Sequence, residues 1–293
     1  MPTPDRPRLV PAATLDHAAL TALFNLGFSG YLVPMYMSED RLREHIAVND
    51  IELDRSIVAV DTEPVGFALL ARRGSAAWIG GMGIAPSHRR TGLGARVLRA
   101  TLDAARAAGV GDVWLEVLEG NQPAIALYEM LGFERVRHLS IWSLGPEPRA
   151  VVEHRTLDVD AAQAWIAAHR AGREPWQRAD PSLVRMRERG EPITAVAVPG
   201  ADSIAAAAIC KPDAGTVRIL QLAGLNRAAA RAVLLAAAGE LTLRLANIPS
   251  DDMSSGVLRR LGASLSATQH EMRLALSAGR SAESPPGAAA EPQ

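Results

Sequence analysis

The stretch 78–133 constrains the fold of this 293-residue chain more than any other part of it. It reads as an apolar strand, a turn rich in glycine and arginine, an alanine-rich helix, a second strand and a short helix. Apolar residues recur at helical spacing over 93–108, so one side of that helix can face a core. This order of elements places the N-terminus of the first helix beside a cleft.

The first turn of that helix is expected at Thr91–Ala95, directly after Arg89 and Arg90. The first four amides of a helix lack partners within the helix, and the helix dipole is positive there, so an anion is favoured. Gly92 and Gly94 let a phosphate approach the backbone without Cβ atoms in the way. The turn therefore predicts a pyrophosphate site. The alternative is an ordinary glycine turn with a solvated arginine pair.

The sequence does not match the consensus of two better-known phosphate-binding motifs. A P-loop requires Gly-Lys-Ser/Thr, and the only lysine of the chain is Lys211. A dinucleotide-binding fingerprint requires a third glycine, where this chain has Val97 or, counted from Gly81, Pro86.

A carboxylate and a phenol follow the anion-binding turn. Residues 113–118 alternate as a strand does, and Glu116 lies mid-strand on the side opposite Val117. It is either solvated or a general base whose pKa burial would raise. Tyr128 lies on a helix that Asn121 opens as an N-cap; by itself it could be no more than a half-buried amphipathic side chain.

These residues together resemble the GNAT superfamily of N-acetyltransferases. The cofactor loop of that family reads Gln/Arg-x-x-Gly-x-Gly/Ala and is matched by Arg89, Gly92 and Gly94. Asn121, Tyr128 and the sequence Leu-Gly-Phe ending at Phe133 follow at the family's spacing. The resemblance covers 78–133 throughout and extends more weakly over 9–145. It implies an α/β (α+β) GNAT fold, a mixed central sheet flanked by helices, with acetyl-CoA as cofactor.

The resemblance also implies roles for individual residues. The backbone of Met82–Ile84 is expected to line the acetyl and pantetheine arm, and the amides of Arg90–Ala95 to hold the pyrophosphate. Tyr128 is expected to protonate the departing thiolate. Glu116 is the expected base, because strand 78–84 contains no glutamate. The implied cofactor contacts are Met82, Gly83, Ile84, Arg89, Arg90, Thr91, Gly92, Leu93, Gly94, Ala95, Asn121, Ala124 and Tyr128.

The acceptor side is less constrained. The loop 28–37 overhangs the acceptor site in a GNAT fold, so Phe28, Tyr31 and Tyr36 are candidate substrate contacts; they could equally cap the core. Three acidic residues, Asp50, Glu52 and Asp54, hint at a cationic substrate, although such clusters are usually solvated loops.

The second half of the chain reads as a damaged copy of the first. Asn247 echoes Asn121, but Thr242 takes the position of Glu116, and Ser254 or Leu258 that of Tyr128. Asn226 replaces the second glycine of the turn. We therefore expect a tandem duplication with a degenerate second copy; an unrelated α/β domain is the alternative. The expected divisions are a leader at 1–8, a GNAT domain at 9–145 closed by a strand over 135–144, a linker at 146–155, the second domain at 156–276, and a disordered tail at 277–293.

Composition bounds the remaining possibilities. The net charge of −1 gives no global field for nucleic acid, and no apolar run approaches 18 residues. The start of the chain has no signal-peptide pattern, and the seven histidines show no ligand-like spacing. We therefore expect a cytoplasmic protein without metal or membrane contact, either a monomer whose tandem domains mimic a dimer or a homodimer.

The predicted function is acetyl transfer from acetyl-CoA to a primary amine of a small molecule or peptide by direct attack. A peptide or protein N-terminus is one alternative, because Glu116 and Tyr128 also match the acid–base pair of the bacterial ribosomal-protein N-terminal-alanine acetyltransferases. A second is a non-catalytic acyl-CoA-binding regulatory module. A third is the tandem arrangement of mycothiol synthase, which keeps its active copy in the second half, whereas here the motifs lie in the first.

Overall fold

The computed structural model describes residues 6–33, 35–147, 151–201 and 203–276. The described residues form two successive sets of elements in the same order, strand, two helices, three strands, helix, strand, helix, strand. The first set is β1 (Arg8–Pro11), α1 (His17–Gly27), α2 (Glu39–Val48), β2 (Ile57–Val60), β3 (Pro64–Arg73), β4 (Ala76–Ile84), α3 (Leu93–Ala107), β5 (Asp112–Leu118), α4 (Gln122–Met130) and β6 (Glu134–Leu144).

The second set repeats the first element by element. It comprises β7 (Arg155–Leu157), α5 (Val159–His169), α6 (Asp180–Glu188), β8 (Thr194–Pro199), β9 (Ile204–Asp213), β10 (Thr216–Gly224), α7 (Arg227–Ala238), β11 (Thr242–Pro249), α8 (Met253–Arg260) and β12 (Ser264–Ala275). The sequence expectation of a tandem duplication of a mixed α/β fold is thereby confirmed.

Several helix boundaries follow from capping chemistry. Asp16 caps α1 by accepting from the amide of Ala19, and Ser38 caps α2 by accepting from that of Arg41. Helix α3 buries Leu98, Leu102 and Ala105 and ends before Gly109, which has a φ of +74°. The periodicity of the sequence thus fixed this helix to within one residue of its end.

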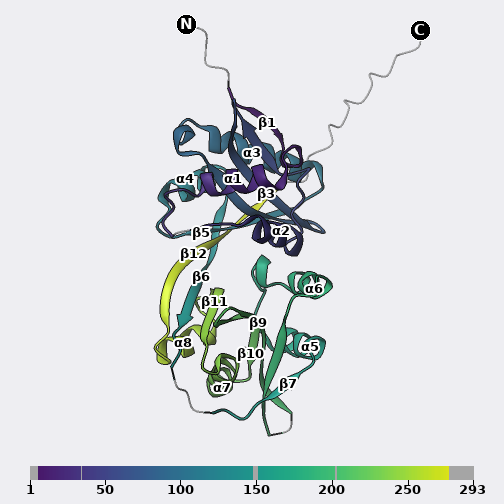
Figure 1. Ribbon diagram of the computed structural model, residues 1–293, viewed down its shortest axis with the longest axis vertical. Coiled ribbons are helices and arrows are strands. Elements are labelled where there is room, and N and C mark those ends of the chain that lie inside the picture. Colours follow the sequence, from purple (N-terminus) through teal and green to yellow (C-terminus); the bar gives the residue numbers. More distant parts are fainter. Residues whose placement is uncertain (1–5, 34, 148–150, 202, 277–293) are drawn as a thin grey trace, which may run out of the picture.

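The described strands form one twelve-stranded sheet in the order β1-β2-β3-β4-β5-β12-β6-β11-β10-β9-β8-β7. In Figure 1 the two halves lie one above the other, and β12, β6 and β11 occupy the region between them. The order reads symmetrically from either end, because β1–β5 of the first half correspond to β7–β11 of the second, and β12 beside β5 corresponds to β6 beside β11.

The two halves exchange their last strands, and one expectation from the sequence was therefore wrong. The strand at 135–144 was expected to close the first sheet. Instead β6 pairs antiparallel with β11 of the second half, and β12 takes the place beside β5, pairing Gln269–Ala275 with Asp112–Leu118. Long-range strand pairing of this kind leaves no trace in local periodicity. The sequence divisions at 145 and 156 stay predictions, and the expected tail and residues 1–5 and 148–150 lie outside the described residues.

An opening between β4 and β5 prepares the site. The extra residue Gly80 on β4 shifts the pairing with β3 between Leu69 and Leu70, a β-bulge of the kind that glycines within a strand often mark. The parallel ladder of β4 and β5 ends at Trp78 and Trp114. Beyond that point the two strands have no pairing with each other, so the edge of β4 is open.

The second half packs directly on the first. Trp176 stacks on Trp78 at 6.2 Å between ring centroids, and its Nε1 donates to the carbonyl of Asn49. The carboxylate of Asp50 pairs with Arg73 and with Arg185 of the second half. Asp50 is therefore engaged in the contact between the halves, which removes much of the basis for reading it as an attractor of cationic substrates. None of the described helices has the length and hydropathy that a bilayer crossing requires.

Candidate active site

A pocket of about 680 Å³ opens where α3, α4 and the end of β4 meet the loop after α1. It collects most of the residues that the sequence singled out. Among its lining residues are Phe28, Tyr31, Met82, Gly83, Ile84, Arg89, Arg90, Gly92, Gly94, Ala95, Asn121, Ala124 and Tyr128.

The N-terminus of α3 forms one end of this pocket and is free to receive an anion. Gly92 is the N-cap with a φ of +83°, a left-handed conformation that favours glycine, and no side chain caps the helix. A Cβ at Gly92 would meet nothing within 4 Å, so the space before the amides of Leu93, Gly94 and Ala95 is open. The uncapped amides and the helix dipole together make a phosphate site.

Arg89 supports the pocket wall by hydrogen bonds to backbone carbonyls. Its guanidinium donates to the carbonyl oxygens of Ile84, Gly27 and Ser29 at 2.9–3.1 Å. It therefore ties the loop after α1 to the end of β4. Gly27 and Gly83 allow this approach, since a Cβ on Gly83 would lie 2.9 Å from the Cα of Gly27.

Tyr128, on α4, also lines the pocket. The helix begins as predicted: the side chain of Asn121 caps it by accepting from the amide of Ala124, and Pro123 lies in its first turn. Tyr128 is buried, and its hydroxyl lies 4.0 Å from the sulfur of Met82. Burial, with a smaller contribution from Tyr31, raises the pKa of Tyr128 above its ordinary value. The phenol is therefore protonated near neutral pH and can act only as a proton donor.

Glu116 lies on the other face of β5. Val113, Leu115 and Val117 pack into the same core as Tyr128, whereas Trp114 packs with Trp78, and Glu116 shares the face of Trp114 by strand alternation. The indole Nε1 of Trp78 donates to Oε2 of Glu116 at 2.7 Å. The other carboxylate oxygen of Glu116, Oε1, is buried without a hydrogen-bond partner in the described part of the chain.

The environment of Glu116 raises its pKa to about 7, from 4.5. Burial is the main cause, and the charge of Glu271 adds to it, against the hydrogen bond from Trp78 and the charges of Arg173 and Arg137. Glu271 lies directly opposite Glu116 in the β12–β5 register and is bound by Arg137 and Arg173 at 2.7 and 2.6 Å. A carboxyl group with this pKa can exchange a proton near neutral pH.

The remaining predicted residues divide between two places. Leu93 has its side chain in the core, and Thr91 is exposed with its hydroxyl donating to the carbonyl of His88, so only their backbones belong to the turn. Phe28 and Tyr31 line the pocket and contact each other edge to face at 5.1 Å. Tyr36 is 77 % exposed and lines a different pocket.

Three residues near Glu116 were not predicted. Trp78 holds its carboxylate, Glu271 reaches it from the last strand, and Trp176 covers Trp78 from the second half. The last two depend on the strand exchange and the packing of the halves, which no local sequence pattern reports. Trp78 was within the recognised strand, but its pairing with Glu116 required the register of β4 and β5.

The corresponding helix start in the second half is closed to anions. Asn226 caps α7 by accepting from the amide of Ala229 at 3.0 Å, so a side chain occupies the position of the incoming phosphate. Gly224 packs against this helix, where a Cβ would lie 2.9 Å from the amide nitrogen of Ala230. The second copy therefore lacks the open turn of the first.

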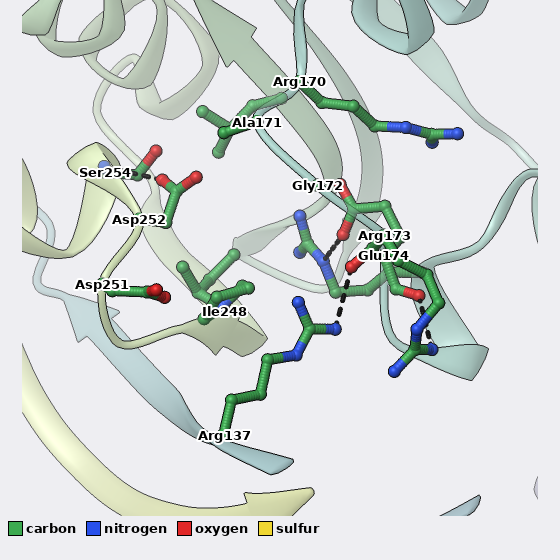
Figure 2. A pocket seen from close by; sticks show the side chains of 13 residues that line it. Arg137, Arg170, Ala171, Gly172, Arg173, Glu174, Ile248, Asp251, Asp252 and Ser254 are labelled. Atoms are coloured by element: carbon green, nitrogen blue, oxygen red, sulfur yellow. Dashed lines mark hydrogen bonds and ion pairs between the residues drawn. The ribbon is translucent and has the colours of Figure 1, made fainter.

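A smaller pocket of about 140 Å³ lies in the second half, beside the Arg137–Glu271 pair (Figure 2). Its charged groups largely satisfy each other: Arg178 donates to Glu174, Arg170 pairs with Asp180, and Asp252 accepts from the amide of Ser254. This arrangement holds the loop 170–174 in place and leaves little unpaired charge for a ligand.

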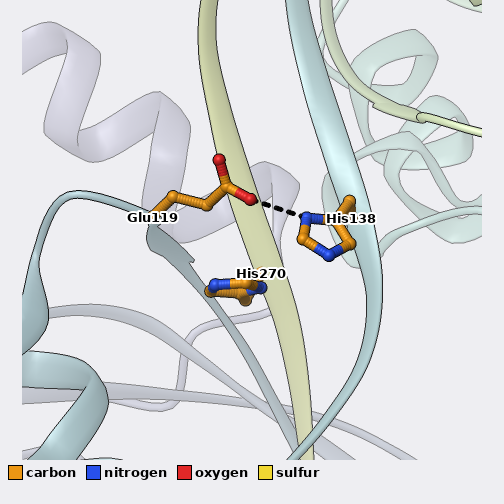
Figure 3. A group of neighbouring side chains, drawn as sticks. All are labelled: Glu119, His138 and His270. Carbon is orange, nitrogen blue, oxygen red and sulfur yellow. Dashed lines mark ion pairs between the residues drawn. The ribbon is translucent and has the colours of Figure 1, made fainter.

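Three potential metal ligands lie close together at the strand exchange, although the histidine spacing did not indicate them. Their ligand atoms lie within 4.8 Å of one another in the described residues, and Figure 3 shows Glu119 pointing toward His138 beside the ring of His270. His138 Nδ1 lies 2.8 Å from the carboxylate of Glu119. His138 and His270 are register partners on β6 and β12, so the fold itself brings them together.

Comparison with known proteins finds a family likeness in the first half. Residues 20–133 match the model of the acetyltransferase (GNAT) family. Streptothricin acetyltransferase from Streptomyces lavendulae is 40 % identical over 86 residues, 27 % of this chain and 44 % of that protein. The ribosomal protein bS18-alanine N-acetyltransferase of Escherichia coli is 48 % identical over 48 residues, 16 % of this chain and 32 % of that protein. The chain thus spans less than half the length of these relatives.

Solved structures match over the whole length. A GCN5-related N-acetyltransferase from Sphaerobacter thermophilus has a TM-score of 0.71 at 17 % identity, covering 93 % of this chain and 96 % of that one. A tandem GNAT protein from the clavulanic acid biosynthesis pathway has a TM-score of 0.64 at 15 % identity, covering 92 % and 98 %. At these identities the likeness is one of fold, and it includes the tandem arrangement.

Proposed function

We propose that this chain, whose first half is a GNAT acetyltransferase domain within a tandem GNAT fold, transfers the acetyl group of acetyl-CoA to a primary amine. Members of this family take acetyl-CoA as acyl donor. The observation that carries the proposal is the 680 Å³ pocket, which joins an open helix N-terminus to the gap between β4 and β5 with a protonated phenol beside it.

The residues of the pocket fit the cofactor. The amides of Leu93, Gly94 and Ala95 would hold its pyrophosphate, and no side chain caps them. The open edge of β4 over Met82–Ile84 would receive the pantetheine arm, and Asn121 and Ala124 line the opposite wall. Once bound there, acetyl-CoA supplies an activated acetyl thioester.

The acid and the base lie on opposite faces of the sheet, which suits direct attack. Glu116 accepts a proton from the acceptor ammonium on one side, and Tyr128 holds a proton for the thiolate on the other. The gap beyond Trp78 and Trp114 lets the reacting groups meet between the two strands. Backbone donors on the open edge of β4 would stabilise charge on the carbonyl oxygen, an effect typically worth about 3–4 kcal/mol.

A peptide or protein N-terminus is the second candidate acceptor. The segment around Glu116 and Tyr128 shares its pattern with the bS18-alanine N-acetyltransferase, and 48 % identity over 48 residues supports a shared acid–base arrangement. The matched segment contains the acid–base region and little of the acceptor surface, so it favours the mechanism more than this substrate.

Two measurements test the proposed function. Titration calorimetry with acetyl-CoA should give one binding site, and release of free thiol should accompany acetylation in a screen of small amines and peptides. Binding without thiol release on any acceptor would favour a non-catalytic acyl-CoA-binding module. Absence of binding would reject the assignment of the pocket.

A further inference from the structure

A second large pocket lies between the two halves, on the face of the sheet that carries Glu116. It has a volume of about 560 Å³. One wall comes from α2 and the residues before it, including Tyr36 and His45, and the other from β9, β10 and β11 of the second half. We call it the interhalf pocket. Its charged or titratable lining residues are Arg41, Glu44, His45, Arg178, Lys211, Asp213, Arg218 and Arg244.

Three cations cross the floor of the interhalf pocket in register. Arg218 on β10 pairs with Lys211 on β9 and with Arg244 on β11, so the three side chains lie side by side on one face of the sheet. Like charges directly opposite each other on neighbouring strands are destabilising. Such a row therefore calls for negative charge close by.

The protein supplies that charge to only part of the row. Glu44 and Glu191 each lie 2.7 Å from the ammonium of Lys211, and Arg178 is paired with Glu174. Within the described residues Arg218 and Arg244 have no salt bridge, and the Nε of Arg218 is buried without a hydrogen-bond partner. A buried guanidinium nitrogen without an acceptor is costly unless a ligand supplies one.

The internal repeat shows that these arginines are not required by the fold. The β4–β5 ladder pairs Trp78 with Trp114, and the β10–β11 ladder pairs Arg218 with Arg244 at the corresponding third position. In the first half the two tryptophans are covered by Trp176 and Arg173. In the second half Arg218 and Arg244 take the sheet positions of these tryptophans, and both line the interhalf pocket.

The interhalf pocket is linked to the candidate base through His45 and Trp78. His45, which lines it, donates from Nε2 to the carbonyl oxygen of Gly80 on the bulge of β4 at 2.8 Å, and its ring centroid lies 5.8 Å from that of Trp78. Trp78 in turn holds Glu116. A molecule in this pocket therefore lies on the side of the sheet from which the amine would approach.

We propose that Arg218 and Arg244 bind a carboxylate or phosphate group of the acceptor, so that the substrate is a small primary amine that also carries an acidic group. The inference rests on the proposed acetyl transfer for the identity of the ligand, but the anion site itself does not. Guanidinium groups bind carboxylate and phosphate oxygens through charge-assisted hydrogen bonds, and the pocket has the size of a small-molecule site.

Titration calorimetry with inorganic phosphate tests the site without turnover. The protein is first saturated with coenzyme A, which occupies the open turn of α3, and ionic strength is held constant with chloride. We expect one phosphate site whose affinity falls about tenfold or more in Arg218→Gln and in Arg244→Gln. Arg231→Gln, an exposed arginine on α7, is the matched control and should bind as the unmodified protein does. No binding, or equal affinity in all variants, overturns the anion site.

Matched acceptors then test the role in acetyl transfer. We expect a higher kcat/KM for phosphoethanolamine than for ethanolamine, or for lysine than for cadaverine. Arg218→Gln and Arg244→Gln should lower this preference about tenfold while leaving unchanged the kcat/KM of the partner that lacks the acidic group. Equal loss on both partners would overturn the acceptor role. Phosphate binding without acetylation of any amine would reject the proposed function and retain the anion site.

Discussion

Glu116 is the residue on which the proposed acid–base mechanism depends. Its carboxyl group combines a mid-strand position, an indole donor and a second carboxylate across the strand pair. Burial and the charge of Glu271 outweigh the hydrogen bond from Trp78 and the charges of Arg173 and Arg137, and the pKa rises to about 7. Burial also raises the pKa of Tyr128. The raised pKa suits Glu116 to the proposed role of base near neutral pH, whereas it keeps the phenol of Tyr128 protonated, as a proton donor must be.

The pH dependence of acetylation follows from this shift. The base is the ionised form, so kcat/KM should rise with pH and level off above about 7. Glu116→Gln removes the base and should lower kcat by roughly 10²–10⁴-fold with little change in acetyl-CoA affinity. Initial rates from pH 5.5 to 8.5 and calorimetric titration measure both. Full activity in the glutamine variant would remove Glu116 from the mechanism.

Trp78 should set the position of that pH profile. Its indole hydrogen bond favours the ionised carboxylate, so Trp78→Phe should raise the pKa of Glu116 and move the rise in kcat/KM to higher pH. Trp142→Phe is the control, because Trp142 is also buried on a strand but its Nε1 has no hydrogen-bond partner in the described residues. The same alkaline shift in both variants would mean that lost packing, and not the hydrogen bond, is responsible.

At the scale of the element, the two copies differ at one helix terminus. Helix α3 begins with a left-handed glycine and no side-chain cap, whereas the carboxamide of Asn226 caps α7. An N-cap side chain and a bound phosphate compete for the same amides. Asn226 therefore corresponds to Gly92, and not to the second glycine of the turn as the sequence comparison suggested, and its side chain closes the amides that α3 leaves open.

Gly92→Asp tests the helix terminus directly. The new carboxylate would cap the amides of α3, repel the pyrophosphate and occupy a φ of +83°, so acetyl-CoA binding should weaken by at least about a hundredfold. Gly74→Asp is the matched control, since Gly74 also has a positive φ, with open space around it, in the turn between β3 and β4. Titration calorimetry with acetyl-CoA measures the affinity of both variants. Comparable weakening in both would attribute the loss of affinity to backbone strain.

At the scale of the whole molecule, the strand exchange makes the halves depend on each other. Met272 on β12 is fully buried among Leu115, Ile125 and Tyr128, residues of the first half. Arg137 on β6 in turn binds Glu271 on β12, and β11 pairs with β6. Neither half therefore has a complete sheet of its own, and the C-terminal strand supplies part of the core beneath the cofactor pocket.

One cooperative unfolding transition is the expected consequence. Calorimetric and van't Hoff enthalpies should agree for the full chain, and Met272→Ala should lower the stability of the whole molecule by about 2–5 kcal/mol. Thr268→Ala on the same strand should cost much less, because Thr268 is partly exposed. Two separate transitions, with only the second shifted by Met272→Ala, would contradict the interdependence of the halves.

The sequence by itself determined the local chemistry. Helical periodicity predicted α3, and the capping residue Asn121 predicted the start of α4. The turn at Gly92 and Gly94 and the spacing to Tyr128 indicated the family, and most of the predicted cofactor residues line one pocket. These features depend on residues within one or two turns of each other, so neighbours in sequence suffice to encode them.

Only the tertiary structure decided the rest. The exchange of β6 and β12 joins strands more than a hundred residues apart, and it alone places Glu271 opposite Glu116 and His270 beside His138. Aligning the two copies could have shown that Arg218 and Arg244 replace Trp78 and Trp114, but not that they face α2 across a pocket. The hydrogen bonds of a strand pair are made by the backbone, so local sequence does not show which distant strand becomes the partner, and the pairing is settled only when both halves pack.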